Sequence, residues 1–130
     1  MAEVEEAIHS RLTGFAGLSA LVEARVYPAK LPQGVTHPAV RYARISGPRA
    51  RSHDGASGLA TPRFQIDAWA ETYSEAKAVA KQIRLAMDNF KGTVAGVVIH
   101  AAFLDSDRDL YDDKAEVHAV SADYTIAHKE

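Results

Sequence analysis

The sequence predicts an α+β fold, in which a mostly antiparallel sheet carries two main helices on one of its faces. Two segments show the apolar period of an amphipathic helix, and several short segments alternate between apolar and polar residues. Most links between the expected strands are short enough for hairpins, while one helix crosses over between strands. The 130 residues provide for one hydrophobic core, so we expect a single domain over 1–130.

The first expected helix begins near Val4, because Val4, Ile8 and Leu12 recur every four residues. Glutamates in its first turn suit the helix dipole, and Thr13-Gly14 is a suitable end. Residues 18–24 predict a second short helical turn, and residues 25–27 an extended segment before Pro28.

Prolines and a glycine predict a loop over residues 28–38, and the alternation over 39–46 then predicts a strand. No period is visible over residues 47–62, where glycine, proline and small polar residues predict a long mobile loop or a weak hairpin. A structureless loop of this length in a compact domain is usually functional or disordered.

Residues 63–70 alternate, with Phe64 and Ile66 on one face and Trp69 on the other. The clearest helix follows. It opens with a capping box formed by Thr72 and Glu75, and we expect it to end at Gly92. Its apolar stripe consists of Ala76, Val79, Ala80, Ile83, Met87 and Phe90.

The C-terminal part predicts a buried strand over 94–104, an acidic turn over 105–109 and a last strand over 116–127. Within the last strand, one face is expected to hold Val120, Ala122, Tyr124 and Ile126.

Composition points to an ordinary soluble globular protein, with 47% hydrophobic and 25% charged residues. The formal net charge of -2 gives no overall attraction to nucleic acid or to anionic membranes. No cysteine is present, which excludes disulfides and thiolate metal sites. The acidic N-terminus differs from a signal peptide, and no apolar run approaches the length that spans a bilayer.

The acidic segment offers one candidate metal site. Asp105, Asp107, Asp109 and Glu116 have the oxygen-ligand spacing of a calcium-binding EF-hand loop. However, Leu110 occupies the position where such a loop needs glycine, and the flanking segments predict strands instead of helices. An exposed acidic turn is therefore the preferred interpretation, and we expect no cofactor and no metal.

Enzymatic chemistry has little support in the sequence. Ser52, His53 and Asp54 are consecutive on the glycine-rich segment and do not form an oriented triad. Nucleophile-elbow, phosphate-loop and dinucleotide-binding motifs are absent, and the six histidines lack the i, i+4 spacing of a zinc-binding helix. We therefore expect a protein that is not an enzyme.

Two groups of residues are candidates for binding partners. The neighbourhood of residues 47–62 is basic. Trp69 projects from the face opposite Phe64 and Ile66, and this lone aromatic marks an interface if the protein's own helices leave that face uncovered. The alternative for Trp69 is burial under a second layer. A candidate subunit or partner interface therefore comprises Arg44, Arg49, Arg51, His53, Arg63 and Trp69. A basic stripe on the second main helix comprises Lys77, Lys81 and Arg84. Its alternative interpretation is a solvated helix face.

Several segments together resemble the tail-completion, or tail-terminator, proteins of long-tailed bacteriophages and phage-like particles. They are the RVYP of residues 25–28, LPQG of 31–34, PAV of 38–40, the loop around 46–55, RFQIDAWA of 63–70 running into TYSEA of 72–76, and SADY of 121–124. The strand-into-helix block is the most specific of these segments, and the similarity extends over most of the chain.

The resemblance implies a noncatalytic virion subunit that is assembled in the bacterial cytoplasm and forms a hexameric ring. Such a ring ends the tail tube, meets a head-side connector or stopper protein, and passes DNA through its lumen without sequence recognition. A closed ring needs a head-to-tail interface, and residues 47–62 would contact a neighbouring subunit or the tail tube protein. The alternatives are another connector of the same particle, such as a stopper or a tube subunit, and a calcium-binding or enzymatic module.

Overall fold

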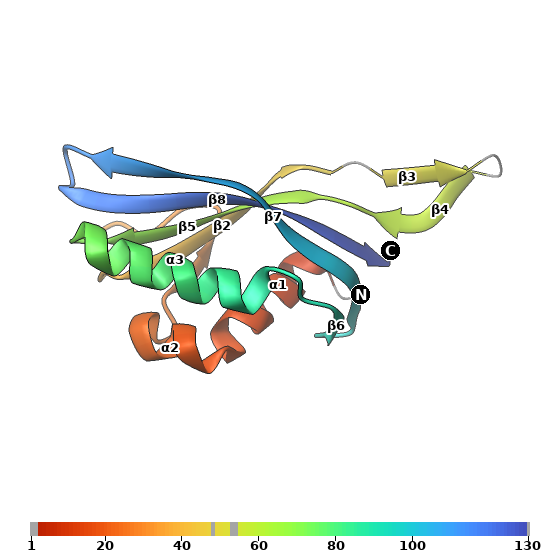
Figure 1. Ribbon diagram of the computed structural model, residues 1–130, viewed down its shortest axis with the longest axis horizontal. Coiled ribbons are helices and arrows are strands. Elements are labelled where there is room, and N and C mark those ends of the chain that lie inside the picture. The colour runs from red at the N-terminus through yellow and green to blue at the C-terminus, as the bar shows by residue number, and fades with distance from the viewer. Residues whose placement is uncertain (1–2, 48, 53–54, 130) are drawn as a thin grey trace.

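The computed structural model describes residues 3–47, 49–52 and 55–129. Within these residues, three helices cover one face of a curled sheet of eight strands, and the other face of the sheet is open (Figure 1). The helices are α1 (Val4–Gly14), α2 (Ala16–Val22) and α3 (Tyr73–Met87). The strands are β1 (Val26–Pro28), β2 (Ala39–Ser46), β3 (Arg49–Ser52), β4 (Gly55–Ala60), β5 (Arg63–Ala70), β6 (Gly92–Val94), β7 (Val97–Asp112) and β8 (Val117–Lys129). The predicted α+β class is confirmed, with α2 as a third, short helix.

The sheet is antiparallel except at one edge, where β1 runs parallel to β2. Its central part has the order β2, β5, β8, β7, and β6 pairs with the first residues of β7. The chain continues from β2 into β3 and from β4 into β5, so these four strands make one long interrupted hairpin. Its outer part, β3 and β4, extends beyond the helices at one end of the molecule and is called the arm below (Figure 1).

The core lies between the helices and the inward residues of the sheet. Phe64 and Ile66 of β5 and Tyr124 and Ile126 of β8 are fully buried, as their alternation predicts. The helices contribute Ile8, Leu12, Leu18, Val79, Ile83 and Met87 to this core. Burial of these side chains supplies the main stabilising free energy, at about 1.5–3 kcal/mol for each large apolar residue.

Helix α3 begins as predicted, because the Thr72 hydroxyl accepts a hydrogen bond from the Glu75 backbone N–H at 3.2 Å. Its end differs from the prediction. The helix stops at Met87, and Asn89 takes the left-handed conformation, with φ of 64°. Asparagine tolerates this conformation, so Gly92 is not needed to end the helix and instead starts β6.

The segment over residues 47–62, predicted as a long loop or a weak hairpin, contains strands β3 and β4. Of the two alternatives, the hairpin is therefore correct for the described residues. Among the described residues, Leu59 and Ala60 of β4 pair with the body of the sheet, through Lys129 and His128 of β8. The arm therefore connects to the central sheet through this pairing and through its continuity with β2 and β5.

The acidic turn predicted at residues 105–109 is wrong, because these residues belong to β7 and the turn lies at 113–116. The reason is that β7 changes register twice against β8, between Ile99 and Ala101 and between Leu104 and Ser106. Each irregularity inserts one residue and exchanges the faces to which the following side chains point. Inward and outward side chains therefore do not alternate regularly along the 16 residues of β7. A prediction that is based on alternation divides this strand into a shorter strand and a turn.

Candidate assembly surfaces

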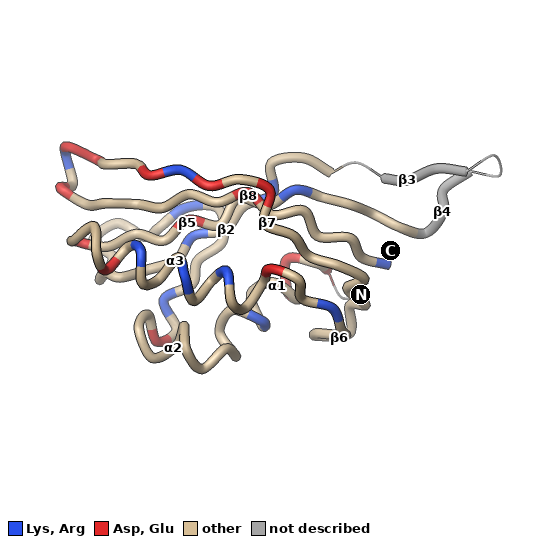
Figure 2. The backbone as a smooth tube through the Cα atoms, viewed as in Figure 1, with Lys and Arg blue, Asp and Glu red and all other residues tan. Residues whose placement is uncertain are grey.

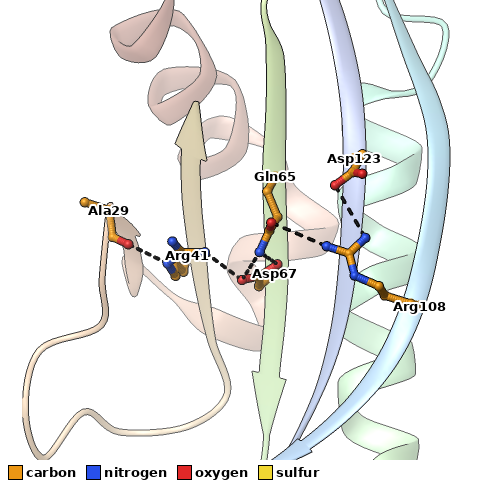
Figure 3. Close-up of polar contacts among 6 residues, drawn as sticks. All are labelled: Ala29, Arg41, Gln65, Asp67, Arg108 and Asp123. Carbon is orange, nitrogen blue, oxygen red and sulfur yellow. Dashed lines mark hydrogen bonds and ion pairs between the residues drawn. The ribbon is translucent and has the colours of Figure 1, made fainter. Parts of the chain in front are cut away.

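The open face of the sheet carries a polar network that crosses the four central strands (Figure 3). Asp67 of β5 lies at its centre, and its side chain is 3% exposed. Nη1 of Arg41, on β2, donates to Asp67 at 2.9 Å, and Nε2 of Gln65 lies 3.1 Å from each carboxylate oxygen. Each hydrogen bond that the buried carboxylate accepts offsets part of the free-energy cost of removing its charge from water.

Two arginines extend this network to its edges. Arg41 also donates through Nε to the carbonyl oxygen of Ala29, which fixes the start of the loop after β1. Arg108 of β7 donates to Oε1 of Gln65 at 3.4 Å and lies 3.5 Å from Oδ1 of Asp123, on β8. The network therefore holds β2, β5, β8 and β7 in fixed register on the face that no helix covers.

Sequence reasoning missed this network, although its residues occupy outward positions of the predicted strands. Arg41 lies opposite Asp67 in the register of β2 and β5. Opposite charges at directly facing positions attract, and the pairing could have been found if the register had been known.

A shallow groove lies on the open face beside Trp69. Trp69, Ala119 and Leu110 face one another in one row across β5, β8 and β7. Trp69 and Leu110 border a cavity of about 460 Å³. The cavity is lined by Trp69, Leu110, Tyr111, Asp112, Asp113 and Lys114, and is called the Trp69 groove below.

Exposed apolar and acidic side chains meet at the Trp69 groove. Leu110 is 43% exposed and lies on the open face, whereas the ring of Tyr111 packs against His118 on the face that carries α3. The indole Nε1 of Trp69 is buried and has no hydrogen-bond acceptor among the described residues. A buried donor without an acceptor is unusual in a folded protein.

The acidic residues concentrate along β7 and the turn after it (Figure 2). Residues 105–116 are exposed throughout and include six carboxylates and two basic side chains. The calcium-loop hypothesis does not fit this arrangement. Asp105 contacts Thr125 and Arg63 on the open face, while Asp109 faces α3, because the register shift at Asp105 separates them. Among the described residues, no group of three or more histidine, aspartate or glutamate side chains has a metal-binding arrangement.

Asp109 binds the start of α3. It accepts hydrogen bonds from Lys77 Nζ at 2.8 Å and from the Tyr73 hydroxyl at 2.7 Å. The bond from Lys77, followed by that from Tyr73, lowers the pKa of Asp109 below its usual 3.8, and the same pair raises the pKa of Lys77. Lys77 is therefore occupied within the chain.

The predicted basic stripe of Lys77, Lys81 and Arg84 is brought together on α3. All three side chains line one cavity of about 230 Å³ between α3 and β7–β8, together with Asp107 and Tyr124. Burial raises the pKa of the Tyr124 hydroxyl, which therefore stays protonated at the floor of this cavity. Lys81 and Arg84 are the exposed members of the stripe that form no ion pair within the described residues.

The predicted interface residues do not form one patch. Arg44 lies at the base of the arm, facing the helix side with Phe64, and Arg63 lies beside it on the open face, 3.4 Å from Asp105. Trp69 lies six residues further along β5, which is about 20 Å in a strand. Arg49 and Arg51 lie on β3, and His53 lies outside the described residues.

Comparisons with known proteins identify the family. The profile of the tail completion protein gp17 family matches residues 6–129. The chain belongs to the tail completion protein gp17 family. This is a family of structural tail proteins, so the chain is a structural tail component of a phage-like particle, as the resemblance implied. No curated protein matches it.

Solved structures share the fold of this tail completion protein. A chain in the virion of a native gene transfer agent particle is 20% identical, with a TM-score of 0.81 over 95% of this chain and 92% of that one. A second solved chain is 16% identical, with a TM-score of 0.63 over the same shares of the two chains. In the tail completion protein, no described helix has the length and apolar character needed to cross a membrane.

Proposed function

We propose that this tail completion protein forms a hexameric ring that ends the tail tube and joins it to the head-side connector or stopper protein. The observation that carries the proposal is the family match over residues 6–129, combined with an open, uncovered sheet face. A ring requires two different surfaces on each subunit. The arm and the Trp69 groove are two such surfaces, at opposite ends of the molecule.

The candidate interface residues have a place in this proposal. The arm, with Arg49, Arg51 and His53 in its sequence and with Arg44 and Arg63 at its base, contacts the neighbouring subunit or the tail tube protein. Its position beyond the helices, at one end of the molecule, supports a contact with another subunit or protein (Figure 1).

The basic stripe on α3 is proposed to face the lumen. Lys81 and Arg84 are exposed cations, and Lys77 beside them is held by Asp109. Cations on the lumen surface would neutralise phosphates of passing DNA without reading its sequence.

The mass of the native protein, followed by negative-stain imaging at high concentration with and without the tail tube protein, tests the proposal. Closed six-membered rings, alone or on tube ends, are the expected result. Long tubes formed by the protein alone would instead identify a tube subunit. Monomers that remain unassembled in the presence of the tube protein would contradict the proposal.

A further inference from the structure

We propose that the arm of one copy of this chain occupies the Trp69 groove of the next copy. This inference rests on the proposed ring and names the two surfaces that join its subunits. It concerns strands β3 and β4 on one side of the joint and the cavity lined by Trp69, Leu110 and residues 111–114 on the other side.

The two surfaces have complementary charge. The segment over residues 47–62 contains Arg49 and Arg51 and one acidic residue, Asp54. The rim of the groove holds Asp112 and Asp113, beside one cation, Lys114. Opposite charges accelerate association and fix the register of an interface.

The two surfaces cannot meet within one chain. The arm leaves the sheet beside Lys129, the end of β8, whereas Trp69 and Leu110 lie beside Ala119, near its start. Figure 1 shows the arm and the turn between β7 and β8 at opposite ends of the longest axis of the molecule. A contact between the arm and the groove is therefore head-to-tail, which is the type of contact that closes a cyclic ring.

The groove also has apolar surface that an arm can cover. Leu110 is a large apolar side chain that stays 43% exposed beside Trp69. Residues of a docked strand would remove this surface from water. Tryptophan and tyrosine are frequent anchors of interfaces because they bury much area at small entropic cost.

Paired charge reversals test the joint. The arm variant is Arg49→Glu/Arg51→Glu. The groove variant is Asp112→Asn/Asp113→Lys, because Asp112 Oδ1 accepts hydrogen bonds from the backbone of Lys114 and Ala115 and asparagine keeps that oxygen. We expect each variant alone to lose ring formation. An equimolar mixture restores it, since the acidic arm meets the basic groove and the two native surfaces meet each other in alternation.

The control reverses an exposed cation to which no binding role is assigned, Lys91→Glu, between α3 and β6. Rings of this control are expected at the wild-type level. Far-UV circular dichroism and a thermal melt of every variant verify that loss of assembly is not loss of folding.

A cross-link gives a readout that does not depend on stable rings. The sequence contains no cysteine, so the thiols introduced by Ser52→Cys in one copy and Lys114→Cys in another can react only with each other or with their own kind. A disulfide requires Cα atoms within about 7 Å. We expect the mixed dimer, which joins position 52 of one copy to position 114 of the other, to exceed either self-dimer at least several-fold.

The outcomes separate this inference from the proposed function. Rings that survive both charge reversals, without the mixed cross-link, would overturn the arm-in-groove joint and leave the ring intact. Absence of rings for the wild type, with or without the tube protein, would overturn the proposed function. In that case a strong mixed cross-link would still support the joint, and its absence would reject the joint as well.

Discussion

The two faces of β5 show how one strand serves two different purposes. On the covered face, Phe64 and Ile66 are buried against the helices and contribute through apolar area. On the open face, Gln65 and Asp67 form hydrogen bonds to arginines of β2 and β7. Adjacent residues of the same strand thus stabilise the molecule by different forces, and only the open face retains polar groups and grooves that a partner can use.

This difference shows that alternate residues along β5 have separate roles: one set stabilises the fold, and the other set is available to an assembly surface. Substitutions on the covered face should change the free energy of unfolding, while most substitutions on the open face should change association. Asp67 is the exception, because it is a charged residue that is buried on the open face. Loss of its hydrogen-bond partners should therefore change the free energy of unfolding.

The largest expected effect comes from the covered face. Phe64→Ala removes a fully buried ring and leaves a cavity, so we expect a loss of about 3–5 kcal/mol in the free energy of unfolding. Urea unfolding followed by circular dichroism measures it. Phe103→Ala is the matched control, since this ring is 47% exposed on the open face, and its cost should stay below about 1 kcal/mol. Equal losses for both variants would show that the two faces do not differ as described.

The second effect concerns the buried charge on the open face. Arg41→Met leaves the Asp67 carboxylate without its cation, and we expect a loss of about 2–4 kcal/mol, because removing one partner of a buried pair exposes its desolvation cost. Arg108→Met, whose side chain is 44% exposed beside Asp123, should cost about 1 kcal/mol or less. Urea unfolding of both variants decides the point. Similar losses would mean that burial of Asp67 does not matter.

A smaller effect concerns the N-terminal cap of α3, which stabilises the helix independently of its packing against the sheet. Thr72→Ala removes the hydroxyl that accepts the Glu75 N–H, and should cost about 1 kcal/mol. Thr72→Ser keeps a hydroxyl at the same position and should recover most of the loss. A thermal melt that gives the same midpoint for both variants would show that packing alone holds the start of α3.

The smallest effect depends on pH. The bonds from Lys77 and Tyr73 lower the pKa of Asp109, so its contribution to stability is present above pH 3.8 and is lost as the pH falls through the lower folded-state pKa. Asp109→Asn should therefore melt slightly below the wild type at neutral pH and equally with it in acid. Both side chains are exposed to solvent, which keeps the difference small. A melting difference that grows in acid would contradict this assignment.

Much of the fold could be predicted from local patterns. The strands at residues 39–46 and 63–70, the last strand and the start of α3 follow from alternation and from the capping residues, which are local properties. For the arm, the sequence left two predictions open, a loop and a hairpin. Its glycines and small residues show no alternation, and its strands depend on the pairing of β3 with β4. The course of β7 was also missed, since each register shift is set by its pairing with β8.

The candidate surfaces were predictable only in part. Trp69 lies on the face of β5 opposite Phe64 and Ile66, and the basic stripe lies on one face of α3, as their spacing predicts. The groove beside Trp69 depends on Leu110 and on residues 111–114, which belong to β7 and the turn after it, about 40 to 45 residues further along the chain. Such long-range neighbours follow from register, which the sequence of a single strand does not specify.

The register shift at Asp105 has a consequence for how this protein can change through evolution. Deleting one residue there would remove the irregularity and turn Arg108 and Leu110 toward α3, while Asp107 and Asp109 would turn to the open face. The groove would lose Leu110 as its wall and α3 would lose the partner of Lys77. The number of residues between Leu104 and the turn therefore acts like a reading frame, in which substitutions are tolerated individually but a change of length alters every position that follows.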